Sequence, residues 1–175
     1  FHIFNNPAYL WLTGDLRSAA ESGYTEPEAG DPDEAGNATD ESADLASSSV
    51  ELLDEIQVLV WHDDGDNVLG ETELVASPHD VDRSTAIDLP RSDAIVTGGT
   101  LREFLSEVSD GGVPLDADSR SPTRDCYPYS TTRHVCVAWW LPVDHANEIQ
   151  TDSVAFDLGF YTEQCRHNDG TGTAP

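Results

Sequence analysis

The segment Ser153–Tyr161 reads SVAFDLGFY and alternates strictly between two kinds of side chain. Val154, Phe156, Leu158 and Phe160 share one face of an extended chain, and more polar residues share the other. A period of two is typical of an antiparallel strand with one apolar face and one face in water. The segment therefore predicts a strand that turns its apolar face toward a core.

Other stretches on both sides of this segment also predict strands. Arg133–Leu141, RHVCVAWWL, is a second strong strand, and Ile56–Trp61, IQVLVW, alternates as a third. Phe1–Leu12 is rich in aromatic and β-branched residues, and Pro7 argues against a helix there. Because each such sheet has one apolar face to cover, we expect a mainly β protein built as an antiparallel β-sandwich.

Two short helices are expected between the strands. Thr100-Leu101-Arg102-Glu103 has the capping-box pattern, and Gly111-Gly112 marks the end of that helix. Its apolar residues recur in one helical stripe: Leu101, Phe104, Leu105 and Val108. Ser48-Ser49-Val50-Glu51 repeats the capping-box pattern before Leu52 and Leu53. We expect the stripe of the helix that begins near Leu101 to pack on a sheet.

The charge balance is strongly acidic. The 175 residues include 34 acids and 8 bases, all of the bases arginine, so the formal net charge is −26. Such a chain lacks the cations that release counterions from nucleic acid or bind an anionic membrane surface. No apolar run approaches the ~18 residues of a membrane span, so we expect no membrane insertion. An acid excess spread along the whole chain favours a halophilic protein, because molar salt shortens the Debye length to about 3 Å.

The loops are long and acidic. Glu21–Glu41 contains many acids, glycines and prolines and little that is apolar, which predicts a surface loop. Within it Asn37-Ala38-Thr39 matches the sequon for N-glycosylation, so Asn37 is a candidate modification site. We expect residues 1–168 to form one β-sandwich domain and residues 169–175, rich in Gly and Thr, to form a flexible tail.

Three cysteines allow one disulfide and leave one thiol outside it. Cys126 lies before one predicted strand and Cys165 lies after another, so a bridge between those strand ends is sterically reasonable. A bridge from Cys126 to Cys136 would instead close a hairpin. In a reducing compartment all three would remain thiols.

One acidic turn is a candidate metal site. Asp63, Asp64, Asp66 and Asn67 supply oxygen ligands of the kind that calcium prefers, although the early glycine does not fit an EF-hand loop. The alternative is a solvated hairpin turn in a chain rich in acids. The sequence indicates no other cofactor. It also contains no zinc-protease, nucleophile-elbow or phosphate-loop motif, so we do not expect an enzyme.

The longest specific stretch is Ala138–Asn168, AWWLPVDHANEIQTDSVAFDLGFYTEQCRHN. It resembles the C-terminal part of haloarchaeal proteins with SipW-type signal peptides, which belong to the TasA/camelysin family. NPAYLWLTG at Asn6–Gly14, GYTEPE at Gly23–Glu28 and the turn at Trp61–Asn67 are similar to the same group.

The resemblance implies an exported, cell-surface or extracellular protein with a jelly-roll-like sandwich. TasA-like relatives form filaments of biofilm matrix, in which a strand of one subunit adds to the open sheet of the next, and this implies self-association. Members of the family have a long region before the strand that contains Asn6, so we expect a sandwich that lacks its first strands and exposes an edge. The resemblance also favours Cys126 and Cys165 as the disulfide pair, with Cys136 as the remaining thiol.

Two other functions stay open. The first is a monomeric halophilic surface module that binds calcium through the Asp63–Asn67 turn, or a surface glycan through exposed aromatic residues. The second is a metalloprotease, as the name camelysin suggests, although the chain carries no recognisable zinc-protease motif.

Overall fold

The computed structural model describes residues 1–3, 5–21, 41–42, 44–46, 50–67, 94–117, 123–142, 149 and 151–171. Within these residues the protein is mainly β, with antiparallel sheets and two short helices, as predicted. Asn37, the candidate glycosylation site, lies outside the described residues. No helix in the described part of the chain is long and apolar enough to cross a membrane.

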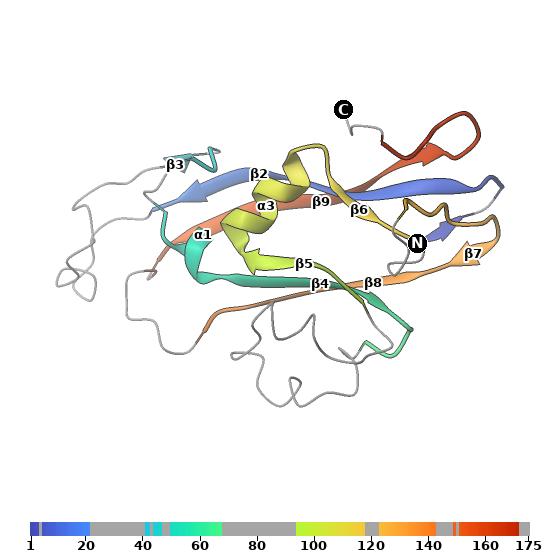
Figure 1. Cartoon of the computed structure of the whole chain (residues 1–175). Helices are drawn as coiled ribbons and strands as arrows, with labels where there is room; N and C mark the ends of the chain where they lie inside the picture. Colours follow the sequence, from blue (N-terminus) through green and yellow to red (C-terminus); the bar gives the residue numbers. More distant parts are fainter. Residues whose placement is uncertain are drawn as a thin grey trace.

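The first large sheet is built on the long strand β2 (Ala8–Ala20). One edge of β2 pairs along its length with β9 (Ser153–Gln164), which confirms the strand predicted from the alternating segment. The other edge pairs with two short strands, β3 (Glu41–Ser42) and β6 (Val113–Leu115). The first and last long strands of the described chain are therefore neighbours (Figure 1).

The second sheet has the order β5-β4-β8, with bounds Ala94–Thr100, Gln57–Asp63 and His134–Trp140. A small ladder of β1 (His2–Ile3) and β7 (Thr131–Thr132) lies beside the start of β8. The helices are α1 (Leu52–Glu55), which leads into β4, and α3 (Leu101–Ser109), which connects β5 to the turn before β6.

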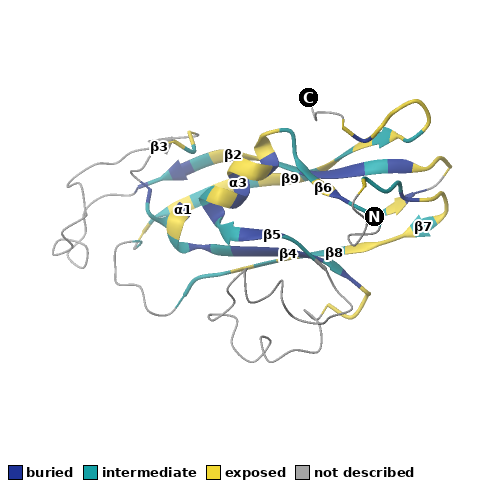
Figure 2. Ribbon diagram, viewed as in Figure 1, coloured by how far each residue is buried: buried dark blue, intermediate teal, exposed yellow. Residues whose placement is uncertain are grey.

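The two sheets face each other across one apolar core. Buried side chains from both sheets and from both helices form a single cluster, which includes Leu10 and Leu12 of β2, Val58 and Val60 of β4, and Phe104 of α3. Helix α3 crosses from the second sheet to the first and packs on β2, so it covers one side of the sandwich (Figures 1 and 2).

Helix α3 begins with the predicted capping box. The Thr100 hydroxyl accepts a hydrogen bond from the Glu103 backbone N–H at 3.2 Å, and the Glu103 carboxylate accepts one from the Thr100 N–H at 3.1 Å. All four residues of the predicted stripe are buried. Gly111 and Gly112 follow with φ angles of 79° and 84°, the left-handed conformation that glycine adopts at low cost.

Two local predictions differ from the structure. Helix α1 starts after Glu51, which occupies the N-cap without a side-chain cap, whereas the capping-box pattern places Ser48 there. Ile56 is already extended, with ψ 125°, because the chain enters β4 at that point. Helix α1 is therefore only one turn long. Strand β2 also runs to Ala20, eight residues past the predicted Leu12, because its pairing with β9 continues to that end.

We expect Thr100→Ala to lower the free energy of unfolding by about 1 kcal/mol, because it removes one half of the capping box. Ser106→Ala on the exposed face of the same helix is the matched control and should cause no loss. Urea unfolding in molar sodium chloride measures both variants. Equal stability of the two variants would contradict the prediction.

Candidate functional site at the open side of the sandwich

Each sheet ends at a strand that has one pairing partner among the described residues. Strand β8 pairs with β4 on one edge, and β9 pairs with β2 on one edge. The two strands lie on the same side of the sandwich, because α3 joins β5 to β6 on the opposite side. We call the side formed by β8 and β9 the open side.

On the core-facing side of β8, Val135 packs against the core, but the two apolar side chains that follow it on that face are exposed. In an antiparallel pair, residues directly opposite each other point to the same face of the sheet. Trp139 is opposite Val58, and Val137 is opposite Val60, and both valines belong to the core. Trp139 is nevertheless 67% exposed and Val137 is 38% exposed. The core-facing side of β8 at Val137 and Trp139 therefore lacks cover among the described residues.

Strand β9 has the same arrangement in the other sheet. Phe160 is opposite the buried Leu12, so it points to the core side, yet it is 52% exposed. Leu158 is opposite Gly14 on the same face and is 40% exposed. Earlier along the strand, Val154 and Phe156 pack against the core. The predicted apolar face of β9 is thus covered at one end and uncovered toward the other.

Covering the four exposed side chains Val137, Trp139, Leu158 and Phe160 would lower the free energy of the protein. Full burial of an apolar side chain of this size contributes ~1.5–3 kcal/mol, so covering four half-exposed side chains would contribute roughly 3–6 kcal/mol. That is comparable to a large part of the stability of a small domain, which is about 5–15 kcal/mol. Covering the open side would therefore contribute a free energy of the same order as folding itself.

The candidate calcium turn brings three of its four predicted residues together. Ligand oxygens of Asp63, Asp64 and Asp66 lie within 4.8 Å of one another. The buried Asp63 already accepts hydrogen bonds from the backbone N–H groups of Gly65 and Asn67, at 2.9 and 3.0 Å. These bonds are typical of a turn held by its own aspartate. Calcium binding here stays a prediction.

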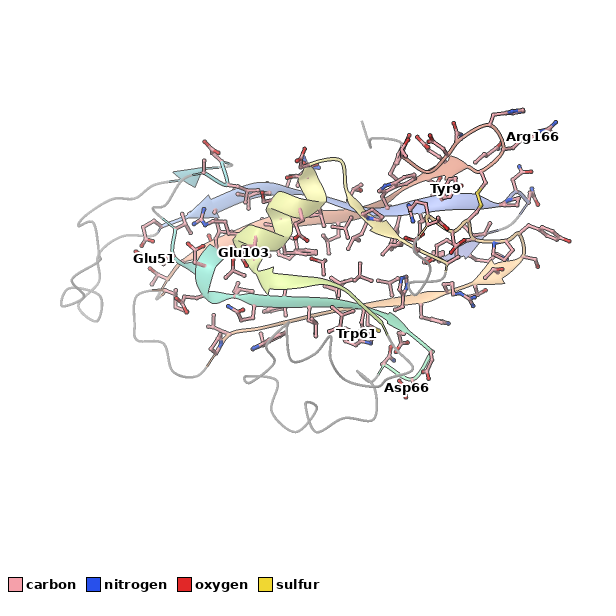
Figure 3. The ribbon with its side chains drawn as sticks, viewed as in Figure 1. Tyr9, Glu51, Trp61, Asp66, Glu103 and Arg166 are labelled. Carbon is pink, nitrogen blue, oxygen red and sulfur yellow. A yellow bond between two sulfur atoms is a disulfide. The ribbon has the colours of Figure 1, made fainter. Side chains whose placement is uncertain are left out.

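The fourth predicted residue points elsewhere. The Asn67 side-chain oxygen accepts a hydrogen bond from the Cys136 thiol at 3.5 Å, and this bond connects the turn to β8. Figure 3 shows Asp66 at the end of the sandwich opposite Glu51. The two residues mark two separate groups of acids.

A second group of acids joins residues that are far apart in the sequence. Ligand oxygens of Glu21, Glu51 and Asp152 lie within 4.8 Å of one another, at the end of β2, the start of α1 and the start of β9. Glu21 is buried, with 6% exposure. Sequence reasoning missed this group because no local spacing connects the three positions.

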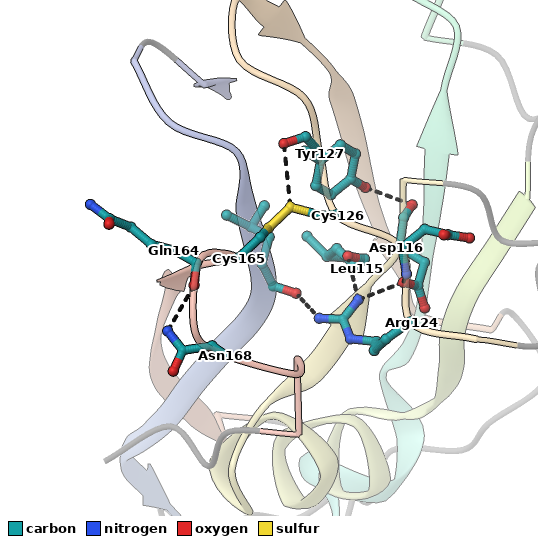
Figure 4. The surroundings of a disulfide bond; sticks show 10 residues. Leu115, Asp116, Arg124, Cys126, Tyr127, Gln164, Cys165 and Asn168 are labelled. Carbon is teal, nitrogen blue, oxygen red and sulfur yellow. Dashed lines mark hydrogen bonds and ion pairs between the residues drawn. A yellow bond between two sulfur atoms is a disulfide. The ribbon is translucent and has the colours of Figure 1, made fainter.

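The structure joins Cys126 and Cys165, which ties the end of β9 to the segment before β7 (Figure 4). Cys136 stands outside the disulfide. The pair is the one that the family resemblance favours.

Arg124 anchors the same end of the first sheet. Its guanidinium donates to the backbone oxygens of Leu10 and Leu115 at 2.7 and 2.8 Å, and it pairs with Asp116 at 2.8 Å. It also lies 4.7 Å above the Trp11 ring, within the range of a cation–π contact. This one side chain therefore connects β2 and β6 and covers an aromatic ring of β2.

Two titratable side chains lie between the sheets near this end. Burial lowers the pKa of His62, while Asp116 raises it and Arg133 lowers it further. Burial also raises the pKa of Tyr127 to about 12, and its hydroxyl donates to the Asp116 backbone oxygen at 2.7 Å. Both groups therefore favour their neutral forms at neutral pH.

Comparison with known proteins adds no relative. No protein-family model matches the chain, and no curated protein and no solved structure matches it either.

We expect the double variant Cys126→Ala/Cys165→Ala to lose about 2–4 kcal/mol of unfolding free energy, because the bridge closes a long loop in the unfolded chain. The two cysteines are separated by 39 positions. Cys136→Ala removes a thiol outside the disulfide and should change stability much less. Urea unfolding under non-reducing conditions measures all three proteins, and equal midpoints would contradict the expectation.

We expect stability to fall as the pH is lowered from 7.5 to 5.5. An unfolded histidine has a pKa near 6.5 and takes up a proton before His62 does in the folded protein. The stability that neutral His62 contributes is present above that value and is lost as the pH falls toward its lowered folded pKa. His62→Asn should flatten the pH dependence, which urea unfolding of the wild type and this variant across the pH range measures. Parallel curves for wild type and His62→Asn would refute this.

Proposed function

We propose that the protein is a structural, non-enzymatic subunit of an extracellular assembly, and that β-strand addition at the open side joins it to its neighbours. One observation carries the proposal: two core-facing side chains of each edge strand, Val137 and Trp139 of β8 and Leu158 and Phe160 of β9, are exposed. An added strand gains backbone hydrogen bonds at the edge, and its alternate side chains enter the core. The same uncovered side chains also support a jelly-roll-like sandwich to which further strands can be added.

The chemistry of β8 and β9 supports this role. Neither strand contains proline or lysine, and β8 contains no acid, in a chain where 34 of 175 residues are acidic. Asp157 and Glu163 of β9 alternate with its core-facing residues, so they lie on the outer face of the sheet. Edge strands that avoid pairing usually carry charges, prolines or bulges. Neither strand contains a proline, and the core-facing positions of both strands carry no charge.

The family resemblance supports an exported location and a filament as the form of the assembly. The net charge of −26 sets the conditions for it. Two such chains repel each other in dilute buffer, but in molar salt the repulsion extends only about 3 Å. Assembly is therefore proposed to require high salt.

We expect negative-stain electron microscopy of the protein in molar sodium chloride to show filaments. Phe160→Asp places a charge on the core-facing side of β9 and should abolish assembly. Ala155→Asp adds the same charge to the exposed outer face of the same strand and is the matched control.

Circular dichroism verifies that both variants fold. Compact monomers of the wild-type protein under all salt conditions would overturn the proposal. They would favour the monomeric surface module, for which the Asp63–Asn67 turn is the candidate calcium site.

A further inference from the structure

The chain contains three Asp-Gly dipeptides, which begin at Asp64, Asp110 and Asp169, and all three lie within the described residues. An Asp-Gly pair can close into a cyclic imide, because glycine has no Cβ to hinder attack of its backbone nitrogen on the aspartate carboxyl. The attack is fastest where that nitrogen has no hydrogen-bond partner and the aspartate side chain is not held elsewhere. The three dipeptides differ in these two respects.

The turn at Asp64 holds its glycine nitrogen. The Gly65 N–H donates to the Asp63 carboxylate at 2.9 Å, so this hydrogen bond must break before the nitrogen can attack. The Asn67 N–H donates to the same carboxylate at 3.0 Å and fixes the conformation of the turn. The turn therefore opposes ring closure at Asp64.

The dipeptide at Asp169 is held at both of its residues. The Asp169 carboxylate accepts hydrogen bonds from the Thr171 hydroxyl at 2.5 Å and from the Thr171 N–H at 3.1 Å, and these bonds lower the pKa of Asp169. A lowered pKa keeps the carboxyl ionised, whereas ring closure expels water from the protonated form. Gly170 is buried, and a Cβ at this position would lie 2.8 Å from the Tyr9 ring. Its backbone therefore has little room to rearrange.

The dipeptide at Asp110 has none of these restraints among the described residues. Asp110 follows the last residue of α3 and is exposed. Its backbone N–H donates to the Ser106 oxygen at 3.3 Å, but in the described part of the chain neither the Gly111 N–H nor the Asp110 carboxylate has a hydrogen-bond partner. A Cβ at Gly111 would meet no atom within 4 Å, so the space around this residue is open.

We propose that Asp110 and Gly111 are the site at which the folded protein isomerises to isoaspartate. The Gly111 nitrogen attacks Cγ of the protonated Asp110 carboxyl and forms a C–N bond, and the hydroxyl group leaves with the amide proton as water. A water molecule then adds to the main-chain carbonyl carbon of Asp110 and breaks the bond from that carbon to the Gly111 nitrogen. The main chain now runs through the Asp110 side chain. The reaction consumes no oxidant or other reagent, and the inference does not depend on the proposed function.

The modification adds one carbon atom to the main chain between α3 and β6. Gly112 is packed closely on β2, because a Cβ there would lie 2.9 Å from the Leu12 oxygen. The next residue, Val113, is already paired with Leu12. The extra atom must therefore be accommodated at the end of α3, where the hydrogen bond from Asp110 to Ser106 is the nearest one. The last turn of α3 is thus the part of the fold that this modification loosens.

The test measures the uptake of heavy oxygen at each dipeptide. The protein is kept for several weeks at pH 6 in molar sodium chloride made with oxygen-18 water, folded in one sample and unfolded in guanidinium chloride in the other. Each imide that hydrolyses takes up one heavy oxygen atom, which peptide mapping by mass spectrometry counts. A protease that cleaves before aspartate but not before isoaspartate identifies the product.

We expect similar uptake at the three sites in the unfolded sample, because the local sequence then sets the rate. In the folded sample, uptake at Asp110 should stay close to its unfolded rate. It should exceed the uptake at Asp64 and Asp169 by about tenfold, the effect of a hydrogen bond that must first break. Folded uptake at Asp110 as slow as at the other two sites would overturn the inference.

Variants of the same dipeptides separate the chemistry from folding. Asp110→Asn closes the same ring with loss of ammonia, so it should deamidate faster in the folded protein than Asp64→Asn or Asp169→Asn. Asp110→Glu would have to form a larger ring and should take up far less heavy oxygen. Circular dichroism verifies that each variant folds. Equal deamidation of the three asparagine variants would contradict the inference, whether or not the protein assembles.

Discussion

Strands β2 and β9 pair from one end to the other, and this ladder positions nearly every other element. It closes a loop of more than a hundred residues. Closing such a loop costs conformational entropy, which the contacts between the two strands must offset. The Cys126–Cys165 disulfide and the Arg124 guanidinium hold one end of it. Because β2 is committed to β9 on one edge, β3 and β6 must share its other edge, and α3 follows to that side.

The same ladder makes the sandwich asymmetric. On the side of β5 and β6, helix α3 fills the gap between the sheets with the stripe that begins at Leu101. On the side of β8 and β9, the described elements leave the inner residues Trp139 and Phe160 exposed. Exposure of polar side chains to water has little cost. Exposure of an apolar inner face is unfavourable, so a strand that covers it would stabilise the sandwich.

The periodicity of the sequence predicted where strands and helices form better than it predicted which of their faces are covered in the fold. The alternation in Ser153–Tyr161 and the capping box at Thr100 correspond to β9 and α3, because both patterns are local. The same alternation showed that Leu158 and Phe160 share a face, but it could not show that this face is uncovered. That depends on which strands are neighbours in space. For the same reason the acids Glu21, Glu51 and Asp152 meet in the fold without any signal in the sequence.

Charge and apolar contact act over different distances at the open side. The inner faces of β8 and β9 carry no acid, so the repulsion between two such chains comes from carboxylates elsewhere and acts over many ångströms. Salt screens that repulsion, whereas the gain from covering apolar surface acts at contact and is not screened. Higher salt would therefore strengthen the proposed association, although it weakens most contacts between opposite charges. A high acid content would keep subunits apart in dilute medium and would permit strand addition only where the salt is concentrated.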